Sequence, residues 1–341
     1  MVAARSESEG KARPRIAGQR VLSGIQPSGI QHLGNYFGAV RQFIALQEGN
    51  RAAYFMADLH SLTSIRDAKR RRELTQAVAL DFLALGVDPA RSVLYRQSDF
   101  PEVTELAWIL TTVTPMGLLQ RCVSYKDKLD QGLKPDHGLF AYPVLQAADI
   151  LIWRADCVPV GQDQKQHLEV TRDIAVKFNL TYREVLKLPE PYILEEAAVV
   201  PGSDGKKMSK TAGNGIEMFA SEKTLRSQIM GIVTDSKGVA EPKDPETSTI
   251  FQLYSLFANP EERAALAEAF RRGGLGYGDA KKALLEKVLA YFGPARAKRR
   301  ELESRADTVE DILRDGAARA RADTAELMHE VRAAAGVGAA R

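Results

Sequence analysis

The sequence predicts an α/β fold, with a Rossmann-like doubly wound parallel sheet followed by a C-terminal helical domain. Two observations carry this prediction. Up to about residue 200, short apolar runs alternate with longer segments of helical pattern, which is typical of βαβ units and a parallel sheet. Beyond residue 211 the β-branched runs disappear, and Ala, Leu, Glu, Arg and Lys dominate, which favours helices.

The elements follow from these patterns in chain order. Short runs rich in strand-forming residues predict strands over 20–25, 52–58, 92–98 and 157–160. Longer segments predict helices over 34–48, 67–85, from Pro101 onward, and over 143–153 and 163–178. Further helices are expected over 261–270, 279–292 and 323–335. We expect a flexible tail over 1–18, a Rossmann-type domain over 19–211 and a helical domain over 212–341, whose last helices are candidates for packing back on the first domain.

Composition excludes several classes of protein. The 341 residues carry a net charge of +3, too small for a protein that coats nucleic acid by charge alone. Hydrophobic residues make up 45% and charged residues 27%, as in ordinary globular proteins. The two cysteines, Cys122 and Cys157, cannot build a disulfide framework, an iron–sulfur cluster on four thiolates or a four-thiolate structural zinc site. No apolar run is long enough to span a membrane, so we expect a cytoplasmic protein without a membrane partner.

The segment SGIQPSGIQHLGNYFGA (23–39) joins the first predicted strand to its helix. Gly24 and Gly29 have the spacing of a phosphate-binding loop, but Ile30 and Gln31 stand where a Walker motif needs Lys and Ser or Thr. The dinucleotide fingerprint GxGxxG is also absent from this turn. What remains is a helix start near Gly34 whose free N–H groups suit a phosphate chain, although such a turn can also serve packing alone.

A second segment, GSDGKKMSKTAGN (202–214), is rich in glycine and lysine. Standing alone, it would be interpreted as a solvated loop. Phosphoryl chemistry needs positive charge at the leaving group more than it needs a general base, and lysines on a glycine-hinged loop supply such charge late in the reaction. One segment lies at the first strand–helix turn and the other lies where the helical domain begins. This order makes it improbable that the two segments occur in one chain by chance.

The two segments carry the signatures of a known family. PSGxxHxGN, ending in His32, Leu33, Gly34 and Asn35, and the KMSK sequence at 207–210 resemble the motifs of class I aminoacyl-tRNA synthetases. The stretches 138–153 and 158–174 are similar to the bacterial tryptophanyl branch of that family. The resemblance implies a ligase that activates L-tryptophan with ATP and transfers it to tRNA(Trp), with an anticodon-binding helical domain and a homodimer.

The resemblance also implies roles for individual residues. The catalytic roles fall to His32, Asn35, Lys207 and Lys210. Contacts with ATP are implied for Gln26, Pro27, Ser28, Gly34, Asn35, Gly161, Gln162, Asp163, Val200, Lys207, Met208, Ser209, Lys210 and Thr211. Contacts with tryptophan are implied for Asp149, His60, Tyr142, Gln146 and Gln26, with Asp149 accepting the indole N–H.

The chain departs from the family pattern at three of these positions. Gln162 replaces a ribose-binding Glu, and Thr211 replaces a Ser and keeps its hydroxyl. Gln146 replaces the Met of many bacterial members and adds hydrogen-bonding capacity, as in the tyrosyl relatives. A tyrosine-charging enzyme and a non-catalytic RNA- or partner-binding paralogue therefore stay open as alternatives.

The sequence also bears on cofactors and on the tRNA. No ligand-like spacing of carboxylates suggests a protein-bound metal. We expect ATP as substrate, Mg²⁺ bound through its phosphates, no iron–sulfur cluster and no structural zinc. The basic stretch 294–305 is a candidate tRNA surface, and Lys126 and Lys128 are candidates for a basic segment facing ATP; an ordinary solvated helix face is the alternative for both.

Overall fold

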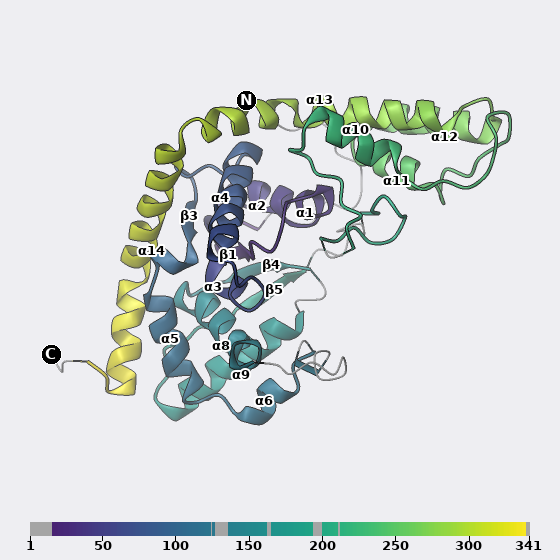
Figure 1. Cartoon of the computed structure of the whole chain (residues 1–341). Helices are drawn as coiled ribbons and strands as arrows, with labels where there is room; N and C mark the ends of the chain where they lie inside the picture. Colours follow the sequence, from purple (N-terminus) through teal and green to yellow (C-terminus); the bar gives the residue numbers. More distant parts are fainter. Residues whose placement is uncertain are drawn as a thin grey trace. The chain divides into compact units, whose positions relative to one another are not determined.

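A computed structural model describes residues 16–123, 125–126, 136–161, 165–193, 200–210 and 212–338. Among them are five parallel strands in one sheet, in the order β3-β2-β1-β4-β5 (Figure 1). The strands are β1 (Arg20–Ile25), β2 (Arg51–Met56), β3 (Val93–Arg96), β4 (Cys157–Val160) and β5 (Glu190–Ile193). This order, with helical connections, is that of a doubly wound Rossmann-like sheet, so the predicted fold class is confirmed.

Each predicted helical segment overlaps a helix of the structure, which also has short helices that the sequence did not predict. They are α1 (Leu33–Asn35), α2 (Arg41–Leu46), α3 (Asp58–Ser61), α4 (Ala68–Leu85), α5 (Glu102–Thr111), α6 (Met116–Gln120), α8 (His137–Ile152), α9 (Lys165–Thr181), α10 (Glu222–Met230), α11 (Thr249–Ser255), α12 (Pro260–Arg272), α13 (Tyr277–Glu303) and α14 (Ala306–Ala335). A π-helical segment, Tyr36–Val40, joins α1 to α2, and the short 3-10 helix η2 (Gln97–Asp99) follows β3. No helix in these ranges is long and apolar enough to cross a membrane.

Local chemistry explains where several elements begin and end. Asp136 caps α8 by accepting from the N–H of Leu139 at 2.9 Å, so this helix starts before the apolar run that predicted it. Asp67 caps α4 in the same way, accepting from Arg70 N–H at 2.8 Å, and Gly86 ends α4 in the left-handed conformation. Strand β3 ends at Arg96 because the next three residues turn into η2, whereas the sequence predicts a strand to residue 98.

The described residues form two compact units whose segments interleave along the chain. The sheet unit contains the described residues of Ile16–Gly29, Arg41–Glu196 and Leu302–Arg341. The helical unit contains those of Ile30–Val40 and Ala197–Glu301. Helix α14 therefore belongs to the sheet unit, whereas the helix start after the first strand belongs to the helical unit. The assignment of catalysis to 19–211 and of anticodon binding to 212–341 stays a prediction.

In the sheet unit, helices α5 and α9 both pack on α8 beside the sheet (Figure 1). The core is apolar and aromatic, and its largest fully buried side chains include Trp153, Tyr95, Phe82 and Phe178. Trp153 donates from Nε1 to the Tyr95 hydroxyl at 3.0 Å, so this buried polar pair is satisfied.

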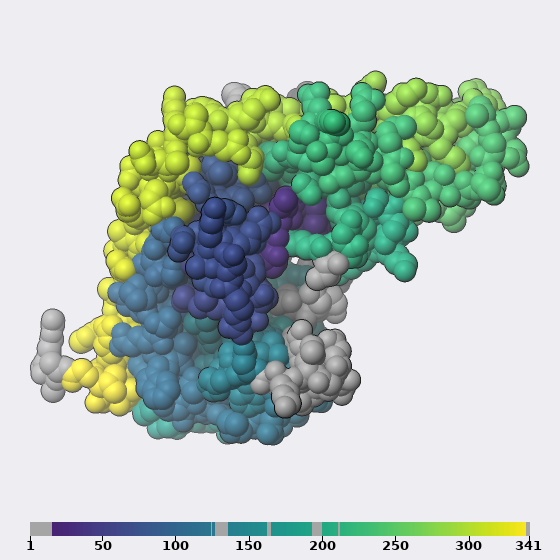
Figure 2. All heavy atoms as spheres, viewed as in Figure 1, coloured from purple at the N-terminus to yellow at the C-terminus, as the bar shows by residue number. Residues whose placement is uncertain are grey.

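Helix α14 lies alongside β3, the outermost strand at one edge of the sheet. A Cβ placed on Gly316 would sit 1.8 Å from the Leu94 carbonyl oxygen, so only glycine permits this approach of the two backbones. Arg332 of α14 makes a two-pronged ion pair with Glu105, at 2.6 and 2.7 Å. In Figure 2 the yellow-green surface of α14 borders the blue surface of the strands and helices that precede residue 110.

The helical unit has an aromatic core of its own. Rings of the π-helical segment pack on rings that follow α11 and that lie in α13: Tyr36, Phe37, Phe257, Tyr291 and Phe292. The hydroxyls of Tyr36 and Tyr291 are 2.8 Å apart. The single helix predicted over 34–48 is thus interrupted by a π-helical segment, a feature frequent near functional sites.

Candidate active site

In the sheet unit, the strand order reverses between β1 and β4. In open parallel sheets, ligands bind beyond the carboxyl ends of the strands at such a point. Gln26, Pro27 and Ser28 follow β1, and Gly161 follows β4. The Gln26 amide donates to the Ser64 hydroxyl at 3.1 Å and to the His60 carbonyl at 3.4 Å. The next predicted nucleotide contacts, Gln162 and Asp163, lie outside the described residues, as do Thr211 and Lys128.

A buried carboxylate, Asp149 on α8, is the centre of a polar cluster in the same unit. Only 1% of Asp149 is exposed. The Gln97 amide donates to its two oxygens at 2.8 and 2.9 Å, and Nε2 of His60 lies 3.0 Å from Oδ2. Burial raises the pKa of Asp149, while the bonds from His60 and Gln97 oppose that shift by stabilising the charged form.

The ring of Tyr142 extends this cluster. Its hydroxyl lies 2.5 Å from Nε2 of His167, and its ring stands edge-on to His60, with centroids 6.3 Å apart. We call His60, Gln97, Tyr142, Asp149 and His167 the Asp149 cluster. Gln146, on the same helix as Asp149, is half-buried, and its side chain makes no hydrogen bond to another described residue. The structure thus brings together His60, Tyr142 and Asp149, which the sequence assigns to tryptophan.

Sequence reasoning missed Gln97, which makes the closest contacts with Asp149. Its side chain is fully buried, at the carboxyl end of β3. The available signal was the polar run Gln-Ser-Asp at the end of an apolar strand pattern, because polar residues gather at that end of a parallel sheet. The predicted strand, 92–98, included Gln97 and Ser98.

The helical unit contains the two signature segments in contact. The N–H of Leu33 donates to the Ile216 carbonyl at 3.0 Å, and the N–H of Gly34 lies 3.3 Å from Sδ of Met208. The sequence predicts free N–H groups at this helix start, whereas here the first two are engaged. A thioether is a weak acceptor, so the bond at Gly34 is a weak one. Asn35 Oδ1 accepts from the backbone N–H of His32 at 3.1 Å.

His32 lies between two glycines in this unit. Cβ atoms placed on Gly34 and Gly215 would approach its ring to 3.1 and 3.3 Å. Its Nδ1 is buried and has no hydrogen-bond partner in the described structure. Burial, together with the positive charge of Lys210, lowers the pKa of His32 to about 4. The imidazole is therefore uncharged at neutral pH.

The lysine loop folds back on itself. Pro201 and Lys207 form an antiparallel bridge, and the N–H of Met208 donates to the Val200 carbonyl at 2.9 Å. Lys207 is exposed, Lys210 and Ser209 are half-buried, and Met208 is buried. We call His32, Gly34, Asn35 and the loop residues Lys207 to Lys210 the signature cluster.

Asn214 is the second residue that sequence reasoning missed. Its Oδ1 accepts from Ser209 N–H at 2.9 Å, and its Nδ2 donates to Asp204 at 2.8 Å and to the Lys207 carbonyl at 3.2 Å. A Cβ on Gly202 would lie 2.4 Å from this side chain, so the glycine is needed here for packing. No pattern in a single sequence marks an asparagine that crosses a loop in this way.

Metal-ligating side chains do not gather within the described ranges. No group of three or more His, Cys, Asp or Glu there has a geometry that could hold a metal ion. Both cysteines are buried, and burial raises the pKa of the Cys157 thiol to about 12.

The parallel sheet, the polar groups at its switch point and a lysine-bearing loop against a helix start define an α/β nucleotide-binding enzyme of the class I synthetase type. Comparison with known proteins narrows the class. The pattern of the family described as tRNA synthetases class I (W and Y) matches residues 17–293. The chain therefore belongs to that family.

Individual relatives cover almost the whole chain. A tryptophan–tRNA ligase of Rhodopirellula baltica is 54% identical over 92% of this chain and 98% of its own length. A tryptophan–tRNA ligase of Fusobacterium nucleatum is 52% identical, over 94% and 98% respectively. Among solved structures, tryptophanyl-tRNA synthetase of Campylobacter jejuni complexed with ADP and tryptophan has a TM-score of 0.89 at 47% identity, over 93% of this chain and all of that one.

Proposed function

We propose that this protein is a tryptophan–tRNA ligase. It joins L-tryptophan and ATP into tryptophanyl-adenylate with release of pyrophosphate, and then transfers the tryptophan to tRNA(Trp). The support is the family to which the chain belongs, the two relatives of that activity at more than 50% identity, and the similar structure solved with tryptophan and ADP.

The observation that carries the choice of amino acid is the buried carboxylate of Asp149. A carboxylate has about four acceptor positions, and the described contacts from Gln97 and His60 account for three of them. One further donor can be accepted, and the indole N–H supplies it. Because a site built to receive a hydrogen bond penalises a side chain that cannot donate one, phenylalanine is rejected by chemistry as well as by shape.

The residues of the signature cluster would act on the phosphates. As the tryptophan carboxylate attacks the α-phosphorus, negative charge accumulates on the departing pyrophosphate. Lys207 and Lys210 supply the positive charge. His32 is uncharged near pH 7, so it would contact a phosphate through a hydrogen bond and would not contribute a positive charge. The Asn35 amide NH₂ makes no bond within the described residues and is available to a phosphate oxygen.

Other parts of the proposal rest on the resemblance and on the relatives. Mg²⁺ bound through the ATP phosphates would neutralise part of their charge. We propose nucleotide contacts for Gln26, Pro27, Ser28, Gly161 and Val200. We also propose a cytoplasmic homodimer whose helical unit contacts the tRNA anticodon.

One observation favours a second candidate, a tyrosine-charging enzyme. Gln146 is half-buried with no hydrogen-bond partner in the described structure, three residues before Asp149 on the same helix. An amide at this position can bind a phenol hydroxyl, whereas the Met common in tryptophanyl enzymes cannot.

The deciding experiment is ATP–pyrophosphate exchange by the purified protein with tryptophan and, separately, with tyrosine. We expect tryptophan-dependent exchange to exceed tyrosine-dependent exchange by orders of magnitude. Exchange that is faster with tyrosine would overturn the assignment in favour of the second candidate. If no amino acid supports exchange, the protein is a non-catalytic paralogue.

A further inference from the structure

The short helix η2 (Gln97–Asp99) connects several elements of the sheet unit through its three residues. Gln97 bonds to Asp149 on α8, and Ser98 donates to Asp58 of α3 through its hydroxyl at 2.6 Å and its N–H at 3.0 Å. Asp99 accepts from Arg96 at 3.0 Å. η2 thus lies where β3 ends, and the elements that carry Asp149 and His60 both bond to it.

The orientation of the Gln97 amide is determined by its surroundings. Its Oε1 accepts the N–H of Leu59 at 3.1 Å, so its NH₂ faces Asp149. The reverse orientation would place two N–H donors together and an oxygen against the carboxylate. Because the side chain is fully buried, no solvent competes for these bonds.

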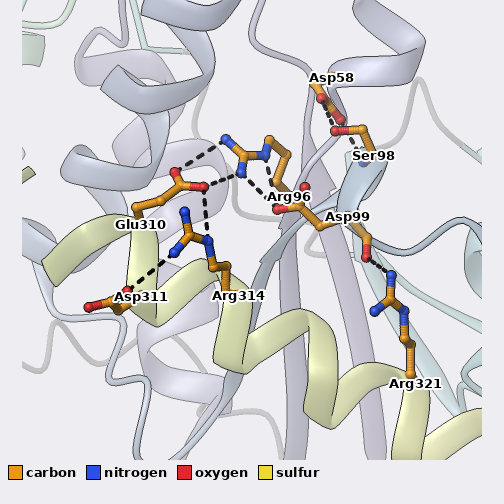
Figure 3. A network of polar contacts seen from close by, with 8 residues as sticks. All are labelled: Asp58, Arg96, Ser98, Asp99, Glu310, Asp311, Arg314 and Arg321. Carbon is orange, nitrogen blue, oxygen red and sulfur yellow. Dashed lines mark hydrogen bonds and ion pairs between the residues drawn. The ribbon is translucent and has the colours of Figure 1, made fainter. Parts of the chain in front are cut away.

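Helix α14 braces η2 from outside the cluster (Figure 3). Glu310 accepts from Arg96 at 2.6 and 3.4 Å, and Arg321 donates to the Asp99 carbonyl at 2.7 Å. Figure 3 shows Arg96 between the carboxylates of Glu310 and Asp99. The backbone on either side of Gln97 is therefore tied to a long helix, so the amide is placed before any ligand arrives.

From these contacts we propose that Gln97 is a positioning residue that sets amino-acid selection by keeping Asp149 oriented and ionised. This inference rests on the proposed function, since it takes Asp149 as the acceptor of the side-chain N–H. Gln97 acts through Asp149, so its loss reduces recognition of the amino acid and leaves the handling of ATP unchanged.

Other groups that face Asp149 determine how the effect depends on pH. Asp58 on α3 and the buried Tyr95 on β3 interact electrostatically with it, and His60 bonds to it. Neither Asp58 nor Tyr95 donates a hydrogen bond to Asp149. Once the Gln97 amide is removed, His60 remains as the donor among the described residues, and Asp149 takes up a proton at higher pH.

The test uses two substitutions at this position and one matched control. Gln97→Met keeps the volume and removes both donors, whereas Gln97→Glu keeps the shape and places a second carboxylate against the first. Gln47→Met is the control: Gln47 is also a buried glutamine of the sheet unit, and it bonds to Asp88, Ser92 and the Gly86 carbonyl. Exchange kinetics are measured between pH 5.5 and 8.5 with tryptophan, phenylalanine and ATP varied in turn.

For Gln97→Met we expect KM for tryptophan to rise about tenfold or more, because hydrogen bonds to charged groups are among the strong ones. KM for ATP should stay within about twofold. The acid limb of kcat/KM for tryptophan should move up by about one pH unit. For Gln97→Glu the pH trend should invert: KM for tryptophan falls on acidification, since one shared proton restores the donor to Asp149.

A purely structural role would make Gln97→Met resemble Gln47→Met, with lower thermal stability and unchanged selection, and that result would overturn the proposal. So would a Gln97→Glu enzyme whose pH trend matches that of the wild type. The amino acid that the wild-type enzyme prefers in the exchange assay tests the proposed function separately. If the wild type activates another amino acid, the proposed function fails. The ratio of KM in each Gln97 variant to KM in the wild type, measured with that amino acid, still supports or overturns the role of Gln97.

Discussion

The Asp149 cluster and the signature cluster are built differently. In the first, side chains from α3, η2, α8 and α9 bond or pack directly on one another around a fully buried carboxylate. In the second, the two signatures meet where the N–H of Gly34 lies against the Met208 thioether, Nδ1 of His32 has no described partner, and Lys207 is exposed. Under the proposed function, recognition of the amino acid would use side chains that are already placed, whereas phosphate chemistry would use groups that gain their contacts in the transition state.

The largest effect on the signature cluster is expected from Lys210→Ala. If Lys210 acts chiefly on the departing pyrophosphate, the adenylation rate constant should fall by about 10² to 10³-fold, with tryptophan affinity nearly unchanged. Single-turnover adenylate formation and equilibrium binding of tryptophan measure the two quantities. Lys206→Ala, at an exposed position of the same loop, is the matched control and should leave both near wild type. An unchanged rate in Lys210→Ala would mean that the loop is only structural.

The complementary change is Asp149→Asn, which keeps the size of the side chain and removes its charge. The Gln97 amide would then face another amide in a buried site, so kcat/KM for tryptophan should fall by about 100-fold. KM for ATP should change little. Exchange kinetics with both substrates varied provide the measurement. An equal loss of kcat/KM for tryptophan and for ATP would contradict the assignment of separate roles to the two clusters.

The pKa of His32 gives a pH test of the signature cluster. Its pKa in the folded chain is about 4, below the ordinary 6.5, so the unfolded chain binds more protons between these values. Stability contributed by the neutral ring is therefore complete above about pH 6.5 and is lost as the pH falls toward 4. His32→Gln should flatten this part of the unfolding free-energy profile, measured by denaturant titration. A wild-type profile without such a decline would place the ring in a more polar environment than the structure indicates.

The smallest effect is expected from the brace on α14. Arg96 and Glu310 are about one-quarter and one-third exposed, and such pairs contribute on the order of 0.5 to 1 kcal/mol. Glu310→Gln should raise KM for tryptophan about threefold at most and leave KM for ATP unchanged. Asp311→Asn is the control, because the partner of Asp311 among the described residues is Arg314 on the same helix, at 3.6 Å. Identical behaviour of the two variants would show that the brace does not reach the cluster.

Much of the fold and part of the candidate site follow from the sequence. The strand pattern and the long helical pattern are local signals, and they placed β1 and α4 within a residue or two. The turn after β3 was not predicted, because Gln97 and Ser98 extend the strand pattern in the sequence. Their hydrogen bonds to Asp149 and Asp58, which are distant in the chain, accompany the turn. Asn214 was missed because its partners Asp204, Lys207 and Ser209 are brought to its side chain only by the folding of the loop.

Some predictions were right about a residue and incomplete about its environment. Gly24 has the spacing of a phosphate-binding loop, yet a Cβ on it would lie 2.5 Å from the ring of Phe55, so this glycine is needed for packing against β2. The last helix was predicted over 323–335 and begins at Ala306. Periodicity alone could not reveal that Gly316, usually unfavourable within a helix, fits against the backbone of β3.

The contact at Gly316 also bears on how the chain is made. Strand β3 is synthesised more than two hundred residues before α14, and until then its outer edge has no helix beside it. An exposed strand edge is a template for pairing with other chains. Helix α14, which shields this edge, is thus synthesised long after it, and a chain stopped before α14 should be prone to aggregate during synthesis.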